Sequence, residues 1–520
     1  MSIEFLLSNH AVFPWTTNNV GSFRGYIYDS HDKKIQGIEA IEYLRGKLLN
    51  NEKLPISGLN GSFSAVITID SICFAISDAI GAFPLFYCVS ESGTWIGDDA
   101  NVIADRTKIQ QRKYTDHFEI FSICPRNETL FPNVFQILAG EGITVNNGKV
   151  LRFIHGQIAD YQGEAKLEIQ QVWDATLDRM LSNEVPLKWV VPLSGGWDSR
   201  LILASLWDRG VRNIVTYTYG VKDSFEVEAA QHVAKTLGLD WHFVEYDAEC
   251  LSAFWRKEVQ QFFKTESRGA FSIQEQELFA LLHLKEQGVI HSGYIAVPGY
   301  CGDLLAGSYT IPGLLKDQPF DAAYAWQWIQ AKHLSFIDKI ESKKFATELL
   351  RTQLFDGEYI TMGDWLSHYE KWFTQQKVSK YIVSGLRSYE FAGIEWRMPF
   401  WDRTWMDYWY QQPLEKRWDR IHFKQWANRR YFEPLSISMR IESESAFEVD
   451  GWKERLRLNY PSVFSTLRHL AFWRKSADIN NSRNLEKEVS SRLIQHGIQP
   501  RIAQLNPLLA QWVLWMNKDR

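Results

Sequence analysis

The residue types best suited to chemistry gather between Ser194 and Ser199, in the segment Ser-Gly-Gly-Trp-Asp-Ser. The apolar run at 189–193 before it lacks helical spacing and predicts a short buried parallel strand. The apolar positions at 201–206 after it predict a helix, which Ser199 or Asp198 would cap. Glycines that take a positive φ leave the backbone open to an anion, and a helix N-terminus favours phosphate. We therefore expect the strand, loop and helix to form a phosphate-binding unit.

This loop differs from the two best-known nucleotide loops, because neither the Gly-Lys-Ser/Thr of a P-loop nor a Gly-x-Gly-x-x-Gly is present. Its Ser-Gly-Gly-x-Asp-Ser pattern resembles the pyrophosphate loop of the N-type ATP pyrophosphatases. Those enzymes cleave ATP to AMP and pyrophosphate while they activate a carboxyl or carbonyl group. An ordinary strand-to-helix turn rarely combines all six positions. The resemblance implies a nucleotide site that contains Leu193, Ser194, Gly195, Gly196, Asp198 and Ser199.

From about residue 170 onward, helices alternate with short strands, which predicts a parallel sheet. The runs at 214–219 and 241–246 are the expected second and third strands, and a helix is expected at 221–237 between them. Ligands of such sheets lie beyond the carboxyl ends of the strands.

The end of the second expected strand is therefore a candidate adenine neighbour, made of Thr218, Tyr219 and Gly220. Glu226 follows near the start of the next helix, where it has two readings. It is either an acidic residue of the nucleotide site or a charge that the helix dipole favours. The sequence leaves both open.

A second group of chemical residues is Gly299-Tyr300-Cys301-Gly302-Asp303, which follows an expected strand. This segment resembles the "S-G-x-G-x-D-E-x-x-G-G" block of the asparagine synthetase family, which includes the β-lactam synthetases and the lasso-peptide cyclases. In that family the aspartates of this block and of the first loop hold Mg²⁺ on pyrophosphate. The resemblance implies that Asp198 and Asp303 are metal ligands and that Gly299 lies beside the nucleotide. Mg²⁺ prefers hard oxygen ligands and shares them with phosphates, whereas a lone aspartate after a strand is more often a helix cap.

Tyr300 departs from the asparagine synthetases, which have glutamate at this place. The β-lactam and carbapenam synthetases have tyrosine there, and it helps to deprotonate an amine of the substrate. The resemblance implies a catalytic role for Tyr300 and an amine acceptor other than that of asparagine synthesis. The glutamate that partners the tyrosine in those enzymes is expected near residues 380–384, and that stretch contains none.

Two further blocks lie in the last third of the chain. Residues 393–402 resemble the family's "G-V-E-x-R-x-P-F-L-D" segment, in which we expect Glu395 and Arg397 to pair structurally. The segment at 423–426 resembles a lysine-bearing helix and implies a catalytic Lys424. A later family lysine is missing, and we expect Arg440 to replace it as a fixed cation near phosphate.

The first 155 residues are rich in short strands separated by tight turns. Their blocks at 60–63, 77–87 and 129–141 resemble the N-terminal glutaminase domain of asparagine synthetases. In working glutaminases the residue after Met1 is a cysteine nucleophile whose own amino group is the base. Here it is Ser2, and no counterpart of the glutamine-holding motifs lies between residues 19 and 53. We expect a structural remnant, although Ser2 leaves glutamine hydrolysis open.

Composition limits the class of protein. With 520 residues, 45% hydrophobic and 23% charged, the chain is long enough for two folded domains. A net charge of −5 gives no indication of a nucleic-acid partner. The five cysteines lack metal or disulfide spacing, and neither a signal segment nor a run of 18 apolar residues is found. We expect a cytoplasmic protein with no membrane partner.

These patterns predict a two-domain α/β protein. An N-terminal, β-rich αββα domain of the Ntn glutaminase type is expected at 1–155, a linker at 156–168, and a synthetase domain at 169–520 with the parallel sheet of adenine-nucleotide α-hydrolase-like ATP pyrophosphatases. The predicted function is an ATP- and Mg²⁺-dependent ligase that adenylates a small-molecule or peptide carboxylate and passes the acyl group to an amine. The alternatives are an asparagine synthase that uses Ser2 or ammonia, and an inactive scaffold. A homodimer or a pathway partner stays open.

Overall fold

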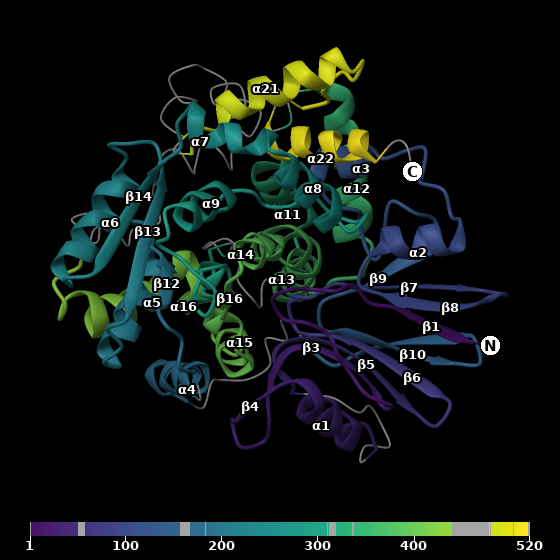
Figure 1. Cartoon of the computed structure of the whole chain (residues 1–520), viewed down its shortest axis with the longest axis horizontal. Coiled ribbons are helices and arrows are strands. Elements are labelled where there is room, and N and C mark those ends of the chain that lie inside the picture. The colour runs from purple at the N-terminus through teal and green to yellow at the C-terminus, as the bar shows by residue number, and fades with distance from the viewer. Residues whose placement is uncertain are drawn as a thin grey trace.

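The computed structural model divides into a unit of two stacked sheets and a unit built on a parallel sheet (Figure 1). It describes residues 2–49, 58–156, 167–182, 184–308, 310, 319–334, 337, 339–438, 478, 480–502 and 504–517. Most of the expected linker at 156–168 therefore lies outside the described residues, as does Arg440.

The two-sheet unit spans the first third of the described chain. One sheet has the order β1 (Ile3–Leu6), β8 (Gly93–Gly97), β7 (Leu85–Ser90), β9 (Val134–Ile137). The other has the order β11 (Lys149–Ile154), β10 (Glu141–Asn146), β6 (Ile72–Ser77), β5 (Asn60–Ile69), β3 (Gly21–Tyr28), β2 (Thr16–Thr17), with β4 (Lys34–Ile35) paired to β3. The strands expected from alternating residues in this region are thus present.

Apolar residues that alternate along these strands stack the sheets into layers. The space between the sheets is filled by residues of both, such as Val66, Leu85 and Ile143. Helix α1 (Gly37–Leu49) covers the larger sheet, whereas α2 (Ala100–Thr107) packs on the smaller one. The order of layers is therefore helix, sheet, sheet, helix.

The second unit contains five parallel strands among its described residues, in the order β14 (Asp240–Glu245), β13 (Ile214–Gly220), β12 (Trp189–Pro192), β15 (Ile295–Ala296), β16 (Glu395–Trp396). The chain moves outward from β12 in one direction and then crosses to its other side. Loops that follow β12 and β15 therefore leave the sheet in opposite directions, which opens a crevice at their carboxyl ends.

Helices surround this sheet and complete the second unit (Figure 1). Their bounds are α4 (Ile169–Leu181), α5 (Trp197–Asp208), α6 (Phe225–Thr236), α7 (Ala248–Ser252), α8 (Lys257–Glu266), α9 (Leu278–Glu286), α10 (Gly302–Leu305), α11 (Ala322–Ile329), α12 (Ile340–Leu354), α13 (Met362–Phe373), α14 (Leu386–Ala392), α15 (Arg403–Tyr410), α16 (Leu414–Arg417), α17 (Ile421–Ala427), α21 (Ser482–Gln495) and α22 (Leu505–Met516). The helix expected at 221–237 begins later, because Ser224 caps α6 by accepting a hydrogen bond from the Val227 N–H.

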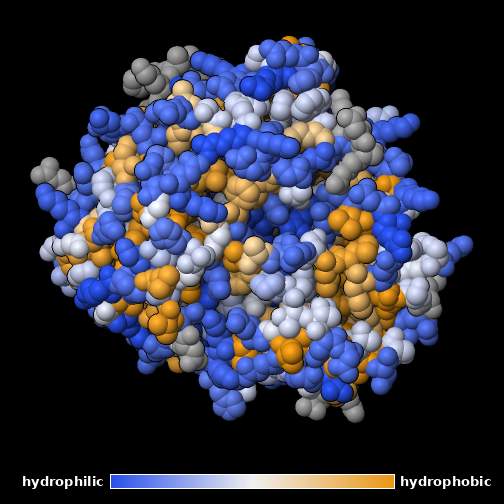
Figure 2. Space-filling model, viewed as in Figure 1, coloured by the Kyte–Doolittle hydropathy of each residue, from blue (hydrophilic) through white to orange (hydrophobic). Residues whose placement is uncertain are grey.

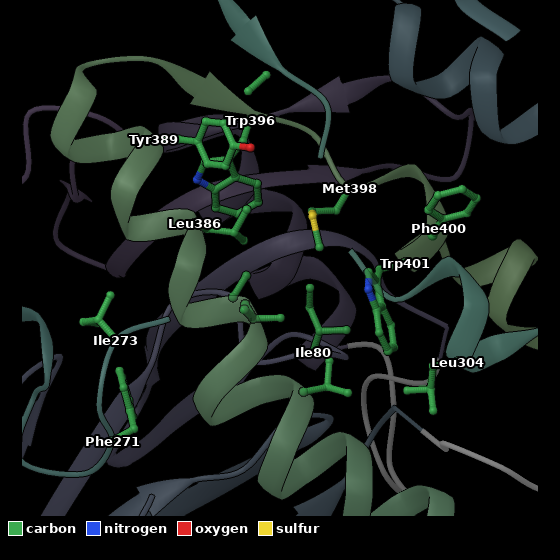
Figure 3. Close-up of a cluster of buried hydrophobic side chains, with 14 of the residues drawn as sticks. Ile80, Phe271, Ile273, Leu304, Leu386, Tyr389, Trp396, Met398, Phe400 and Trp401 are labelled. Atoms are coloured by element: carbon green, nitrogen blue, oxygen red, sulfur yellow. The ribbon is translucent and has the colours of Figure 1, made fainter. Parts of the chain in front are cut away.

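The two units share one hydrophobic core. Figure 3 shows Ile80 of the two-sheet unit among Leu386, Met398 and Trp401 of the second unit. Near the chain's end, α22 packs against α8 and against α3 (Asp116–Phe121), so the last helix also bridges the units. Burying apolar side chains from both units makes their relative placement part of the fold.

The block at 393–402 lies at this junction. The Arg397 guanidinium donates to Glu395 at 2.9 Å, as expected, and it also contacts Glu184. Asp402 accepts from Arg179 and from Asn60 at 2.8 Å, which links α4 to the two-sheet unit. The block is therefore structural in its described contacts.

On the face shown in Figure 2, hydrophobic side chains form patches separated by polar ones. Within the described ranges, none of the helices combines the length and apolar character needed to cross a bilayer.

Candidate active site

A cavity of about 440 Å³ lies at the carboxyl ends of β12, β13 and β15. Its wall is built by residues of several segments that are distant in sequence: Pro192, Leu193, Ser194, Gly196, Trp197, Asp198, Ser199, Thr218, Tyr219, Ser224, Glu226, Gln276, Glu277, Gly299, Tyr300, Asp303, Arg420 and Asn480. The cavity thus brings together most of the residues that sequence motifs single out, although Gly195 and Gly220 are not among the residues that line it.

The Ser-Gly-Gly loop is held by its own serines. The Ser199 hydroxyl accepts a hydrogen bond from the Ser194 N–H at 3.1 Å, so it braces the loop and does not cap α5. The expected positive φ at the glycines was wrong. Position 195 favours glycine for another reason, because a Cβ there would lie 3.2 Å from the Ala229 methyl group on α6. The loop is tight because α6 packs directly against it.

The position of Glu226 is compatible with both of its expected roles. Its carboxylate accepts a hydrogen bond from the Gly195 N–H at 2.6 Å and also lines the cavity. It lies in the first turn of α6, where the helix dipole favours a negative charge. Glu226 therefore fixes the loop while facing the same space as the loop.

Asp198 and Asp303 both line the cavity and are in contact with each other. The Asp303 N–H donates to Asp198 Oδ2 at 2.9 Å, whereas the buried Asp198 Oδ1 has no hydrogen-bond partner among the described residues. Burial raises the pKa of Asp198 well above its usual range, and the charge of Asp303 raises it further. Gly299 leaves room for the Asp198 side chain, since a Cβ at residue 299 would lie 3.1 Å from Asp198 Cβ.

An orphaned carboxylate oxygen beside a second carboxylate fits a divalent cation. The described residues contain no group of three or more His, Cys, Asp or Glu side chains placed to hold a metal. Two protein carboxylates leave coordination positions for substrate oxygens, which is the usual arrangement for Mg²⁺ on phosphates.

The residues expected beside adenine occupy one side of the cavity. The Thr218 hydroxyl donates to the Leu193 carbonyl at 2.7 Å and accepts from the Trp241 indole at 2.9 Å. Tyr219 lines the cavity and stacks on Tyr246. Thr218 therefore links the end of β13 to Leu193, with its one hydroxyl proton already donated.

Tyr300 has a carboxylate partner, although not where the sequence suggested. Its hydroxyl donates to Glu277 Oε2 at 2.8 Å, and Glu277 immediately precedes α9 rather than lying at 380–384. Gly385, just after that stretch, gives the tyrosine room, since a Cβ there would lie 2.8 Å from the Tyr300 hydroxyl oxygen. No motif marks Glu277 in the sequence. The only available signal was an acidic residue directly before an apolar helix.

Burial raises the pKa of the Glu277 carboxyl to about 7, against the effect of hydrogen bonds from the Tyr389 and Tyr300 hydroxyls. Burial and the charge of Glu277 together raise the pKa of Tyr300 well above its usual range. Near neutral pH the pair therefore consists of a protonated phenol and a carboxylate that readily gains or loses a proton.

Comparisons with known proteins support the family suggested by these motifs. The family model "Asparagine synthase" matches residues 168–436, just over half of the chain. The chain belongs to the asparagine synthase family. No curated protein sequence gave a match.

Among solved structures, this asparagine synthase family member is matched to a glutamine-dependent NAD⁺ synthetase from Acinetobacter baumannii with ADP (14% identity, 46% of this chain and 58% of that chain, TM-score 0.20). Another match is the glutamine phosphoribosylpyrophosphate amidotransferase from B. subtilis with ADP and GMP (11% identity, 56% and 58%, TM-score 0.18). The chain spans less than two thirds of the length of either protein. Likenesses at these TM-scores support no conclusion about the fold or activity of this family member.

The positions of the cationic residues differ from the sequence-based expectation more than those of the other site residues. Lys424 does not line the cavity, and its ammonium group contacts Asp419 at 2.7 Å. Arg440 lies outside the described residues. Arg420, which no sequence motif marked, lines the cavity instead.

Proposed function

We propose that this chain is an ATP-dependent ligase that activates a carboxylate as an acyl-adenylate and joins it to an amine. The observation that carries the proposal is the contact between Tyr300 and Glu277 in the same cavity as Asp198 and Asp303. A phosphate loop with paired carboxylates suits the activation of an acid, and a buried phenol and carboxylate suit the removal of an amine proton.

In the first step a substrate carboxylate oxygen attacks the α-phosphorus of ATP. The bond from that phosphorus to the bridging oxygen breaks, and pyrophosphate leaves. Asp198 and Asp303 would hold Mg²⁺, which neutralises the charge on the phosphate oxygens. The loop at 194–199 positions the phosphate chain at the start of α5, where N–H groups and the helix dipole favour negative charge. Positioning and charge neutralisation supply most of the catalysis.

In the second step the amine nitrogen attacks the acyl carbon, and the bond to AMP breaks. The nitrogen must lose a proton as it becomes an amide nitrogen. Tyr300 accepts that proton on its oxygen while it gives its own proton to Glu277 Oε2, 2.8 Å away. The same hydrogen bond from Tyr300 holds the Glu277 carboxylate in place.

The acceptor is an amine of a second substrate or of the activated molecule itself. Tyrosine in place of the family's glutamate favours this over asparagine formation.

The four-layer order of the two-sheet unit supports an Ntn-type origin, and Ser2 in place of cysteine favours loss of glutamine hydrolysis. Ser2 is exposed at the start of β1, where its carbonyl accepts from the Thr94 N–H. Both alternatives, an asparagine synthase and a scaffold, are outcomes of the test.

The test measures pyrophosphate release from ATP and Mg²⁺ against a panel of carboxylates, with ammonia or amines. Asp198→Asn is compared with Asp208→Asn, a partly exposed aspartate at the other end of α5. Release that needs one carboxylate, survives in Asp208→Asn and disappears in Asp198→Asn supports the proposal. Release with aspartate and glutamine that is lost in Ser2→Ala supports asparagine synthesis. Failure of the wild-type protein to bind ATP supports the scaffold and contradicts the ligase.

A further inference from the structure

The turn between α16 and α17 is strained, and it directs an arginine into the cavity. Asp419 (φ 43°, ψ 29°) and Arg420 (φ 64°, ψ 25°) are consecutive residues in the left-handed region. A residue with a Cβ occupies this region at a cost in free energy, and two in succession are uncommon. Asp419 is held there by its N–H, which reaches the Thr310 carbonyl at 3.4 Å. Such strain is retained when the surrounding structure imposes it.

The contacts of Arg420 leave donors available. Its Nη1 lies 4.0 Å from Asp303 Oδ2, and its Nη2 lies 3.8 Å from Asp419 Oδ1, both beyond hydrogen-bond distance. Its buried Nε has no hydrogen-bond partner among the described residues. The side chain is 26% exposed and lines the cavity. A planar guanidinium with unused donors is suited to bidentate binding of phosphate oxygens.

The charges around the cavity indicate what this guanidinium meets. Among the described lining residues, Arg420 is the one Lys or Arg, and it shares the cavity wall with four acidic residues, Asp198, Glu226, Glu277 and Asp303. The phosphate chain of ATP would add several negative charges to a wall that is already acidic. Binding of ATP therefore requires a positively charged group beside Asp303. When Asp303 binds the metal, its attraction for Arg420 weakens, and the guanidinium can turn to the phosphates.

We propose that Arg420 binds the phosphate chain of ATP and remains bound to pyrophosphate as it leaves. The inference rests on the proposed function, because it assumes that the cavity binds ATP. It assigns to Arg420 the fixed positive charge that the sequence had suggested for Arg440.

Lys424 acts one step away from the phosphates, as a positioning residue. Its ammonium group contacts Asp419 Oδ2 at 2.7 Å, and its side chain is only 9% exposed. Asp419 is the residue that precedes Arg420 in the strained turn, so this ion pair holds the turn from the side of α17. The Lys424 charge therefore sets the direction of Arg420.

Calorimetric titration with Mg²⁺-pyrophosphate, Mg²⁺-ATP and adenosine tests the assignment of Arg420. Arg420→Gln should weaken both phosphate ligands by about 10- to 100-fold, which is what a charge-assisted hydrogen bond contributes, and leave adenosine binding unchanged. Arg420→Lys should restore part of the loss. The matched control is Arg430→Gln, which removes a surface arginine paired with Asp208 and should leave all three affinities unchanged.

Wild-type affinity retained in Arg420→Gln overturns the inference and leaves the proposed function standing. A wild-type protein that binds neither phosphate ligand overturns both. Thermal melting of each variant, compared with the wild type, separates a local effect from unfolding.

A double-mutant comparison tests the positioning role. Lys424→Met alone should weaken Mg²⁺-pyrophosphate by about 3- to 10-fold, and it should cause no further loss in the Arg420→Gln background, because both act through one guanidinium. Additive losses mean that Lys424 contacts phosphate directly and overturn its positioning role.

Discussion

Buried aspartates in the two units have opposite surroundings. In the two-sheet unit, Asp98 accepts hydrogen bonds from Ser8 and Trp15, contacts His10 at 2.7 Å, and lies 3.8 Å from the Arg24 and Arg268 guanidinium groups. In the parallel-sheet unit, Asp198 accepts a hydrogen bond from the Asp303 N–H through one oxygen, and its other oxygen is buried with no hydrogen-bond partner in the described part of the chain.

The pKa values follow the same division. Burial raises the pKa of Asp98, but hydrogen bonds and the arginine charges outweigh it and hold the pKa well below its usual range. For Asp198 burial and the Asp303 charge act together, and the pKa rises. A buried acid whose partners are all supplied by the chain stabilises the fold. A buried acid for which the chain does not supply all hydrogen-bond partners is suited to bind a ligand.

The largest expected effect concerns the satisfied acid. Asp98→Ala should lower the free energy of unfolding by about 3–5 kcal/mol, because it leaves two buried arginines with less compensation. The control is Asp105→Ala, an exposed residue of α2, which should change it by less than about 0.5 kcal/mol. Denaturant melts measure both. Equal stability of the two variants would contradict the structural role of Asp98.

The next effect concerns the buried pair in the cavity. Glu277→Gln and Tyr300→Phe should each slow amide formation by about 10²- to 10⁴-fold, the usual contribution of general acid–base catalysis. Their melting temperatures should stay close to that of the wild type, and carboxylate-dependent pyrophosphate release should persist. Single-turnover measurements with the identified substrates separate the two steps. If both variants form amide at the wild-type rate, the pair has no part in the chemistry.

The pH dependence should report the same carboxylate. Glu277 must be ionised to accept the proton, and burial raises its pKa to about 7. The rate of amide formation should therefore fall about tenfold for each pH unit below about 7 and level off above it. In Glu277→Gln this acidic limb should disappear. An acidic limb that persists unchanged in the variant assigns it to a different group.

The smallest effect is expected at the start of the two-sheet unit. Ser2→Ala should change amine-dependent ligation by less than about twofold, because the proposed reaction takes its nitrogen from an amine rather than from glutamine. Product formation with and without glutamine measures this. A loss confined to the glutamine-supported reaction would restore a catalytic role to Ser2.

Much of the site could be predicted because its residues are contiguous in sequence. The loop at 194–199 and the segment Gly299 to Asp303 each follow a strand, and parallel strands deliver their carboxyl ends to one edge. The family match at 168–436 agrees with that prediction. The strands of the two-sheet unit were also predictable, since their apolar residues alternate between tight turns.

Glu277 and Arg420 could not be predicted, because their place depends on packing over long sequence distances. Glu277 reaches Tyr300 only because α9 and the glycine at 385 meet around the phenol. Arg420 reaches the cavity through a strained turn that no local propensity favours. The positive φ expected at the glycines of the loop is absent, and at Gly195 it is close contact with α6 that leaves no room for a side chain.

The most direct test of this division is the melting temperature of the wild type and of Asp198→Asn, each with and without Mg²⁺-ATP. Without ligand, the variant should melt at or above the wild-type temperature, because it removes a buried carboxylate that lacks a full set of partners. Ligand at about 100 times its dissociation constant should stabilise the wild type by about 2.7 kcal/mol and leave the variant unchanged. A variant that is destabilised without ligand, yet still stabilised by Mg²⁺-ATP, would show that Asp198 supports the fold and not the nucleotide.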